Sequence, residues 1–189
     1  MNRFKILKTH FFSFQNYKLI PIRTKDVQLI KNWRNNQIDI LRQEEPITKK
    51  QQTDYYNQVI KKSFNDEKPT LMLFSFILND LCIGYGGLTK IDWNIKSTEL
   101  SFLLDTNRIL DSKTYENDFS SFLNMIFELT FNELNFTKIF TETYDVRPLH
   151  ISILENNGFL LEKRIKQHKL INDKIVDVLI HSRQKNIKS

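Results

Sequence analysis

The order of structural signals at residues 138–159 restricts the fold more than any other feature of the sequence. Alternating β-branched and polar residues at 138–144 predict a strand. Pro148 suits the first turn of a helix, and Gly158 suits the position just after its end, because glycine adopts a positive φ without steric cost. Phe159 then begins another extended segment. A strand, a short helix and a second strand in so short a stretch predict a mixed α/β fold.

The rest of the chain fits the same class. Strands are expected at residues 17–24, 70–78, 81–92, 98–105, 138–144, 159–171 and 174–182. Helices are expected from Thr24 or Asp26 to residue 36, from Thr48 to residue 64, over 117–135 and over 148–157, with turns at Asn79-Asp80 and Asn172-Asp173. The order β-α-α-β-β-β-α-β-α-β-β predicts a mixed, mostly antiparallel central sheet flanked by helices. Residues 1–16 are expected to form an N-terminal extension, and residues 17–189 a single domain.

Charge and cysteine content exclude several classes. The formal net charge is +6, but acidic residues are interleaved nearly everywhere and the chain lacks an RNA-binding motif, so we do not expect nucleic-acid binding. Cys82 is the only cysteine, which excludes an intrachain disulfide. The four histidines lack the spacing of metal ligands, so we expect no metal. With no long apolar run and no signal-peptide pattern, we expect a cytosolic protein without a membrane span.

A glycine-rich segment at residues 84–87 has two interpretations. The sequence Gly84-Tyr85-Gly86-Gly87 looks like part of a phosphate-binding loop. It continues a predicted strand, however, and opens no helix, whereas a phosphate loop leads into one. We therefore interpret these glycines as a bulge or as a place where backbones pack closely.

The segment after residue 138 resembles the C-terminal half of the GNAT superfamily of N-acetyltransferases. That family carries a strand followed by Asn-x-x-Ser-Ile-x-x-Leu-Glu-x-x-Gly-Phe, and Ile151, Leu154, Glu155, Gly158 and Phe159 match it. The resemblance extends over about residues 17–184, and its further matches are Ile22-Arg23, Trp33-Arg34-Asn35, residues 83–88, residues 99–102, Arg164, His168 and residues 173–182. Among these matches, Arg164, His168 and residues 173–182 resemble the branch that acetylates ribosomal-protein N-termini and nucleotide-linked amino sugars.

The resemblance implies an acetyl-CoA-dependent N-acetyltransferase with acetyl-CoA as co-substrate. In the family a glycine-rich turn at the start of the long helix binds the pyrophosphate. The aligned residues 114–119 contain no glycine, and Glu116 and Asp118 add negative charge, which Lys113 and Arg108 are placed to offset. The residues that the resemblance assigns to acetyl-CoA are the Leu103 and Leu104 backbone N–H groups for the thioester oxygen, and Lys113, Asn117 and Arg147.

Direct attack of an amine on the thioester requires a group that removes a proton from the amine. Glu99 is our first candidate, and Glu142 with Tyr144, two residues apart on one face of a strand, is the second. The tyrosine that protonates the leaving thiolate in many relatives is Leu154 here. His150 replaces the family's serine and titrates near neutrality, so it is either an acid-base group or a plain helix residue.

The acceptor is predicted to be a small molecule that bears an amine. Arg34 and Arg42 are candidates to pair with a nucleotide diphosphate, and Tyr55, Tyr56 or Trp93 to stack on a base or sugar. These residues favour a 4-amino-sugar nucleotide, with a protein or peptide N-terminus as the second alternative. Because the phosphate-binding glycines are missing, a non-catalytic GNAT-like binding module also stays open. A monomer or homodimer is expected.

Overall fold

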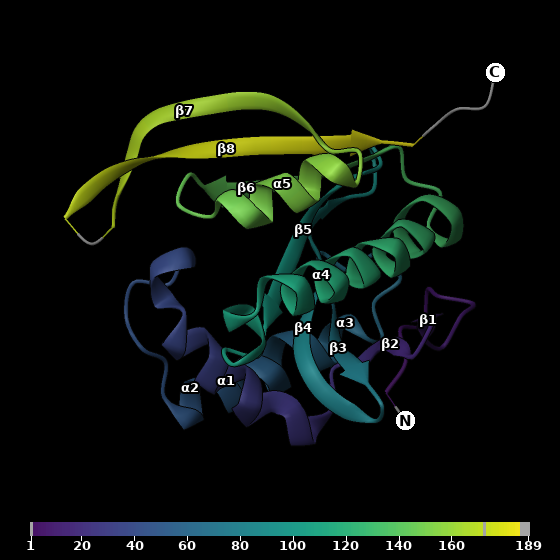
Figure 1. Cartoon of the computed structure of the whole chain (residues 1–189). Coiled ribbons are helices and arrows are strands. Elements are labelled where there is room, and N and C mark those ends of the chain that lie inside the picture. The colour runs from purple at the N-terminus through teal and green to yellow at the C-terminus, as the bar shows by residue number, and fades with distance from the viewer. Residues whose placement is uncertain (1, 172, 186–189) are drawn as a thin grey trace.

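The computed structural model describes residues 2–171 and 173–185, and these form one eight-stranded sheet with helices against it (Figure 1). The strand order is β1-β2-β3-β4-β5-β6-β8-β7, with β5 and β6 parallel and every other neighbouring pair antiparallel. The strands are β1 (Phe12–Phe14), β2 (Tyr17–Pro21), β3 (Met72–Leu78), β4 (Leu81–Asp92), β5 (Ser97–Leu104), β6 (Lys138–Tyr144), β7 (Leu160–Ile171) and β8 (Lys174–Gln184). The predicted mixed, mostly antiparallel fold is confirmed.

The helices lie close to their predicted places, with one exception. They are α1 (Val27–Asn36), α2 (Lys49–Tyr55), which continues through a π-helical turn (Tyr56–Ile60) into α3 (Lys61–Ser63), α4 (Ser112–Phe127) with its π-helical extension (Glu128–Glu133), and α5 (Pro148–Asn156). Short 3-10 turns occur at Thr24–Asp26, Ile38–Ile40 and Arg108–Leu110. The turn at Asn79-Asp80 is present, with φ values of 47° and 66°. Of the second predicted turn, Asn172 lies outside the described residues.

The predicted start of the long helix is wrong. Helix α4 begins at Ser112 because the Asp111 side chain caps it, accepting a hydrogen bond from the Thr114 N–H at 2.7 Å. Tyr115 belongs to its buried face, together with Phe119 and Phe122, at the spacing of one helix face. The segment assigned to the phosphate turn therefore lies inside the helix.

The two faces of the sheet are covered by different elements. On one face, Phe102 stacks on Phe119 of α4 with 4.4 Å between ring centroids, and Phe76 meets Phe122 at 5.4 Å. Helix α5 lies beside α4, and the β7–β8 hairpin extends past both (Figure 1). Since side chains alternate along a strand, Glu99 and Ser101 point to the opposite face of β5. That face lies toward α1 and α2.

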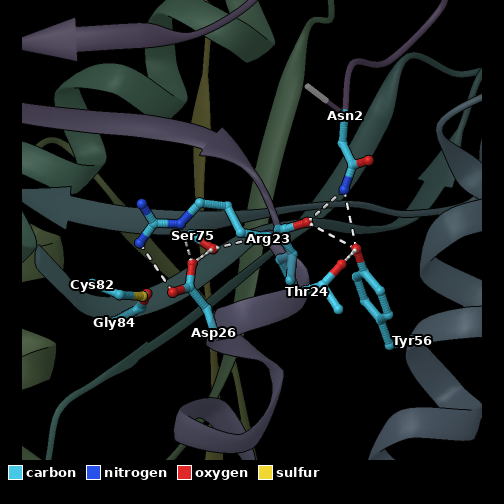
Figure 2. Close-up of polar contacts among 9 residues, drawn as sticks. Asn2, Arg23, Thr24, Asp26, Tyr56, Ser75, Cys82 and Gly84 are labelled. Carbon is cyan, nitrogen blue, oxygen red and sulfur yellow. Dashed lines mark hydrogen bonds and ion pairs between the residues drawn. The ribbon is translucent and has the colours of Figure 1, made fainter. Parts of the chain in front are cut away.

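The N-terminal segment packs onto the domain. Phe4, Leu7 and Phe12 are each at most 5% exposed and belong to the same core as the sheet. The Asn2 side-chain amide donates to the Tyr56 hydroxyl at 3.0 Å and to the Ile22 carbonyl at 3.0 Å (Figure 2). Strand β1 extends the sheet beyond β2, so these residues widen the core that supports the site.

Close backbone packing explains the glycines of β4. A Cβ atom on Gly86 would lie 2.2 Å from the Ser101 carbonyl oxygen and 2.7 Å from the Phe122 ring. Both distances are far below van der Waals contact, so only glycine fits between β5 and α4. The close-packing interpretation of residues 84–87 is confirmed, and it brings β4 and β5 together next to the cleft described below.

Candidate active site

The candidate site is a cleft that opens where two parallel strands separate. Strands β5 and β6 pair only over Ser97–Glu99 and Lys138–Phe140, and beyond these residues they diverge. The cleft between them has a cavity volume of about 90 Å³. Its lining residues are Ile40, Leu41, Arg42, Glu99, Leu100, Ser101, Phe102, Thr141, Glu142, Thr143, Tyr144, Arg147 and His150. The predicted catalytic residues Glu99, Tyr144 and His150 therefore lie together around one cleft, as do Arg42 and Arg147.

The open edge of β5 presents backbone groups to this cleft. Asp105 donates its N–H to the Ile83 carbonyl at 2.8 Å, so its backbone faces β4. Backbone groups alternate in direction along a strand, which turns Leu103 toward β4 and turns Phe102 and Leu104 toward the cleft. The Leu104 carbonyl accepts from the Gln37 side chain at 2.8 Å, as this orientation requires. The geometry thus favours Phe102 and Leu104 over Leu103 as donors to an oxyanion.

Four charged side chains meet at the inner end of the cleft. Glu99 is 2% exposed and its Oε1 forms an ion pair with Arg42 Nη2, while its Oε2 lies 3.0 Å from Lys90 Nζ. Glu142 Oε2 lies 3.4 Å from Arg42 Nη1 and 3.7 Å from Lys90 Nζ. Two carboxylates and two cations balance one another, so these pairs hold a buried carboxylate at the junction with the cleft.

A second cavity, which also borders Glu99, lies toward α1 and α2. Its lining residues are Ile22, Ile30, Arg34, Arg42, Gln52, Tyr55, Ile60, Leu73, Tyr85, Thr89, Lys90, Glu99 and Ser101. Because Arg42, Glu99 and Ser101 line both cavities, the two meet at Glu99. Arg34 reaches this cavity but is held by Tyr85 Oη at 2.8 Å and Gln43 Oε1 at 3.0 Å.

Two of the predicted acceptor-binding aromatics lie elsewhere. Tyr56 is 1% exposed, and its hydroxyl contacts Thr24 Oγ1 and the Asn2 amide, each at 3.0 Å (Figure 2). Trp93 donates its indole N–H to the Pro69 carbonyl at 2.9 Å and packs edge-on against Phe136. Neither lines the two cavities. These two predictions are wrong, because in both cases the ring completes a core that sequence spacing does not define.

His150 belongs to a buried hydrogen-bonded chain. Its Nδ1 lies 2.8 Å from the Tyr115 hydroxyl, which also accepts from Arg147 Nη2 at 2.9 Å. A hydroxyl oxygen that accepts one hydrogen bond can accept a second, so the hydrogen of the Tyr115–His150 contact comes from the hydroxyl or from Nδ1, according to the tautomer of the imidazole. Burial, with a smaller effect of the Arg147 cation, holds the pKa of His150 well below 6.5. The imidazole is neutral at physiological pH and ring-stacked on Phe119 at 4.4 Å.

Two further groups keep their protons, one in the cleft and one outside both cavities. Burial raises the pKa of Tyr144, which is 8% exposed in the cleft, so the phenol is a proton donor and not a base. Burial also raises the pKa of the Cys82 thiol to about 12, with a contribution from the Asp26 carboxylate. A thiol so rarely ionised is a poor nucleophile, which agrees with direct transfer and no acyl-enzyme at this cysteine.

The start of α4 differs from a glycine-rich phosphate site. The Asp111 carboxylate already occupies the Thr114 N–H, and Asn117 lies in the second turn, after the intrahelical bonds have begun with Tyr115 N–H to Asp111 O at 2.9 Å. Lys113 lies in the first turn and is exposed. Of the predicted pyrophosphate contacts, Lys113 is placed to meet a phosphate, and the backbone of Asn117 is not.

Arg108, named above as compensating charge, has another partner. Its guanidinium forms two hydrogen bonds with Asp118, at 2.6 and 2.9 Å, and the same carboxylate accepts from Tyr17 Oη at 2.9 Å. Asp118 is 1% exposed at its side chain, so this carboxylate points into the core and not toward a phosphate. Arg108 and Asp118 therefore stabilise the fold.

Sequence analysis missed three residues of the site. Lys90 lies at an irregularity of β4, and no local signal predicts where such a residue points. The buried Tyr115 was not singled out, although Asp111, three residues before Thr114, is a usable helix-start signal. Phe102 was included only in the match of residues 99–102 to the family, yet its backbone faces the cleft.

Two structural absences bear on the class. Within residues 2–171 and 173–185, no helix is both long enough and apolar enough to cross a bilayer. Over the same described ranges, no three His, Cys, Asp or Glu side chains cluster closely enough to hold a metal ion.

Diverging parallel strands, a strand edge with exposed backbone donors and a buried carboxylate between two cavities define the class of GNAT-type N-acetyltransferases. The sequence profile of the acetyltransferase (GNAT) domain matches residues 19–180. The chain belongs to this family and is an acetyl-CoA-dependent N-acetyltransferase. No curated protein sequence shows significant similarity to it.

Solved structures confirm the fold. Spermidine N-acetyltransferase from Vibrio cholerae in complex with CoA and spermine has a TM-score of 0.77 and 20% identity, covering 90% of this chain and 96% of that one. A chimera of that enzyme with a second acetyltransferase has a TM-score of 0.76 and 19% identity, covering 89% and 95%. Another structure of the Vibrio cholerae enzyme, described as dodecameric, has a TM-score of 0.71 and 20% identity, covering 90% and 95%. For the present chain, a monomer or homodimer stays a prediction.

Proposed function

We propose that the chain transfers the acetyl group of acetyl-CoA to a primary amine of a small polycation of the polyamine class. The observation that carries this proposal is the pair of carboxylates, Glu99 and Glu142, at the junction of the two cavities. A protonated polyamine needs carboxylates at its binding site, and here they are already matched with cations of the chain itself. The similarity to a spermidine N-acetyltransferase supports the same class.

The reaction follows from the positions of the side chains. Glu99 accepts a proton from the bound ammonium, which frees the nitrogen lone pair to attack the thioester carbonyl. The backbone N–H groups of Phe102 and Leu104 face the cleft and stabilise the oxyanion that forms. Tyr144, whose pKa burial raises, keeps its proton and donates it to the leaving thiolate. Arg147 and Lys113 provide positive charge for the phosphates of acetyl-CoA.

A nucleotide-linked amino sugar, which the sequence favoured, has less support. Arg34 is engaged by Tyr85 and Gln43, and Arg42 by the two carboxylates, so neither is poised for a diphosphate. Tyr56, one of the proposed stacking rings, lies in the core.

An acceptor panel tests the proposal. Free thiol released from acetyl-CoA is followed with spermidine, spermine, a 4-amino-sugar nucleotide and a peptide with a free N-terminus, and products are confirmed by mass. We expect turnover with the polyamines and at least about tenfold lower kcat/KM with the others, since each lost charge pair costs about 1.4 kcal/mol or more. Preference for the nucleotide or the peptide would refute the polyamine class. Calorimetry with acetyl-CoA separately tests whether the α4 start still allows binding, and absence of binding would favour the non-catalytic module.

A further inference from the structure

A lysine of the chain contacts the carboxylate that we propose as the base for an acceptor amine. Lys90 lies where the register between β4 and β5 shifts, between Thr89 and Asp92, and has a φ of 46°. A lysine in this left-handed region costs about 1 kcal/mol or more, so the surrounding fold holds it there. Its Nζ lies 3.0 Å from Glu99 Oε2, which is the distance of a close ion pair, although Oε2 has no hydrogen-bond partner of good geometry.

We propose that Lys90 is an internal acceptor and is acetylated on Nζ by the chain's own acetyl-transfer site. The proposal depends on the acetyl-CoA-dependent activity described above. Glu99 and Glu142, which contact the lysine, both line the cleft between β5 and β6. Among the described residues, Lys90 is the one lysine that lines either of the two cavities. Its side chain is 55% exposed, so it is free to move from the carboxylates toward a thioester in the cleft.

The chemical step is balanced with acetyl-CoA as the only co-reactant. Glu99 takes one proton from the Lys90 ammonium, and the freed lone pair forms a bond to the carbonyl carbon of the thioester. The carbon–sulfur bond then breaks. Of the two protons that the ammonium loses in total, one ends on the CoA thiol and the other in solvent. The product is an uncharged acetyl-lysine.

Acetylation changes the charge balance of the site. Before the reaction Glu99 and Glu142 share two cations, Arg42 and Lys90. After it, Arg42 alone remains, and the carboxylates carry an uncompensated negative charge. A cationic acceptor then competes with one cation of the chain in place of two, so acetylated protein is expected to show a lower KM for a polyamine.

The test is a time course of the purified full-length protein with acetyl-CoA and no acceptor, with acetyl occupancy at each lysine measured by peptide mass spectrometry. Lys138 is the matched control, because its Nζ is paired with the Glu162 carboxylate at 2.8 Å and its side chain is 33% exposed, outside both cavities. We expect Lys90 to react about a hundredfold faster than Lys138, because both lysines are paired with a carboxylate but only Lys90 is paired with one that borders the acetyl-transfer cleft. The rate constant is expected to be independent of protein concentration.

Two comparisons decide the outcome. Glu99→Gln, checked for folding by thermal melting, is expected to reduce the rate at Lys90 to that at Lys138. Equal rates at Lys90 and Lys138 in the unmodified protein would overturn the inference, as would a rate at Lys90 that scales with protein concentration. Thiol release with spermidine is measured in parallel. If spermidine is acetylated but Lys90 reacts no faster than Lys138, only the inference that Lys90 is an acceptor is refuted. If neither spermidine nor Lys90 is acetylated, the proposed function is refuted as well.

Discussion

Protonation of His150 is expected to make the protein less stable in mild acid. The side chain is 5% exposed, its Nδ1 lies 2.8 Å from the Tyr115 hydroxyl, and its pKa is held well below 6.5 by burial and by the Arg147 cation. In the unfolded chain the imidazole has its ordinary pKa and binds a proton readily below it. The unfolded state thus binds more protons than the folded state, so stability falls as pH decreases and is restored as pH rises.

The magnitude follows from linkage. Between about pH 7.5 and about pH 5.5, protonation of an imidazole of pKa about 6.5 stabilises the unfolded state by about 1.4 kcal/mol, while the folded imidazole stays neutral. The free energy of unfolding falls by the same amount. For a chain of this size each kcal/mol shifts Tm by about 2–4 °C, so His150 accounts for a decrease of about 3–6 °C. The measurement is Tm at both pH values for the protein and for His150→Gln, whose amide does not titrate.

The change in Tm between the two pH values is compared for the unmodified protein and for His150→Gln. The difference between these two changes isolates the effect of His150 from that of all other titrating groups. Tyr115→Phe serves as a control, because it removes the hydrogen bond and leaves the imidazole buried, and most of the pH effect is expected to persist. If His150→Gln and the unmodified protein lose the same Tm on acidification, the folded imidazole titrates normally and the buried, neutral assignment is wrong.

Three further substitutions test separate parts of the structure. Glu99→Gln is expected to reduce acetyl transfer by about a hundredfold to ten-thousandfold with little change in Tm, because its two partner cations are half exposed and can turn to water; equal loss of Tm and activity would argue for a structural role. Gly86→Ala places a Cβ 2.2 Å from the Ser101 carbonyl oxygen and is expected to cost about 3 kcal/mol in urea denaturation; a cost below about 1 kcal/mol would mean that β4 and β5 separate easily. Asp118→Asn leaves Arg108 without its buried counter-charge and is expected to cost about 3 kcal/mol, largely unaffected by salt; strong salt dependence would place the pair at the surface.

Features determined by neighbouring residues were predicted well. Gly158 has a φ of 81° and follows the last turn of α5, where its N–H donates to Glu155 O at 2.9 Å and that of Phe159 donates to Leu154 O at 3.1 Å. This is a Schellman motif, which depends on a few consecutive residues and is visible in the sequence. The strand bounds of β4 were predicted for the same reason, since Asn79-Asp80 defines the turn before it.

Features determined by residues far apart in the sequence were not predicted well. The predicted start of α4 was wrong because the stretch before residue 117 is polar on its exposed side, and the burial of Tyr115 depends on its contact with His150, far along the chain. Tyr56 and Trp93 are large aromatic rings that fit a binding site and a core equally well. Only the positions of Asn2 and Phe136 next to them decide for the core.

The candidate base shows where sequence reasoning stops. Alternation along β5 places Glu99 on the face opposite Phe102, and such a pattern is local enough to follow from the sequence. Its burial, however, depends on Arg42 from a loop after α1 and on Lys90 from an irregular strand position. A carboxylate with 2% exposure is costly without such partners, so these cations are what allow a base to stay charged between two cavities. The partners that make Glu99 usable are therefore the part of the site that requires the three-dimensional structure.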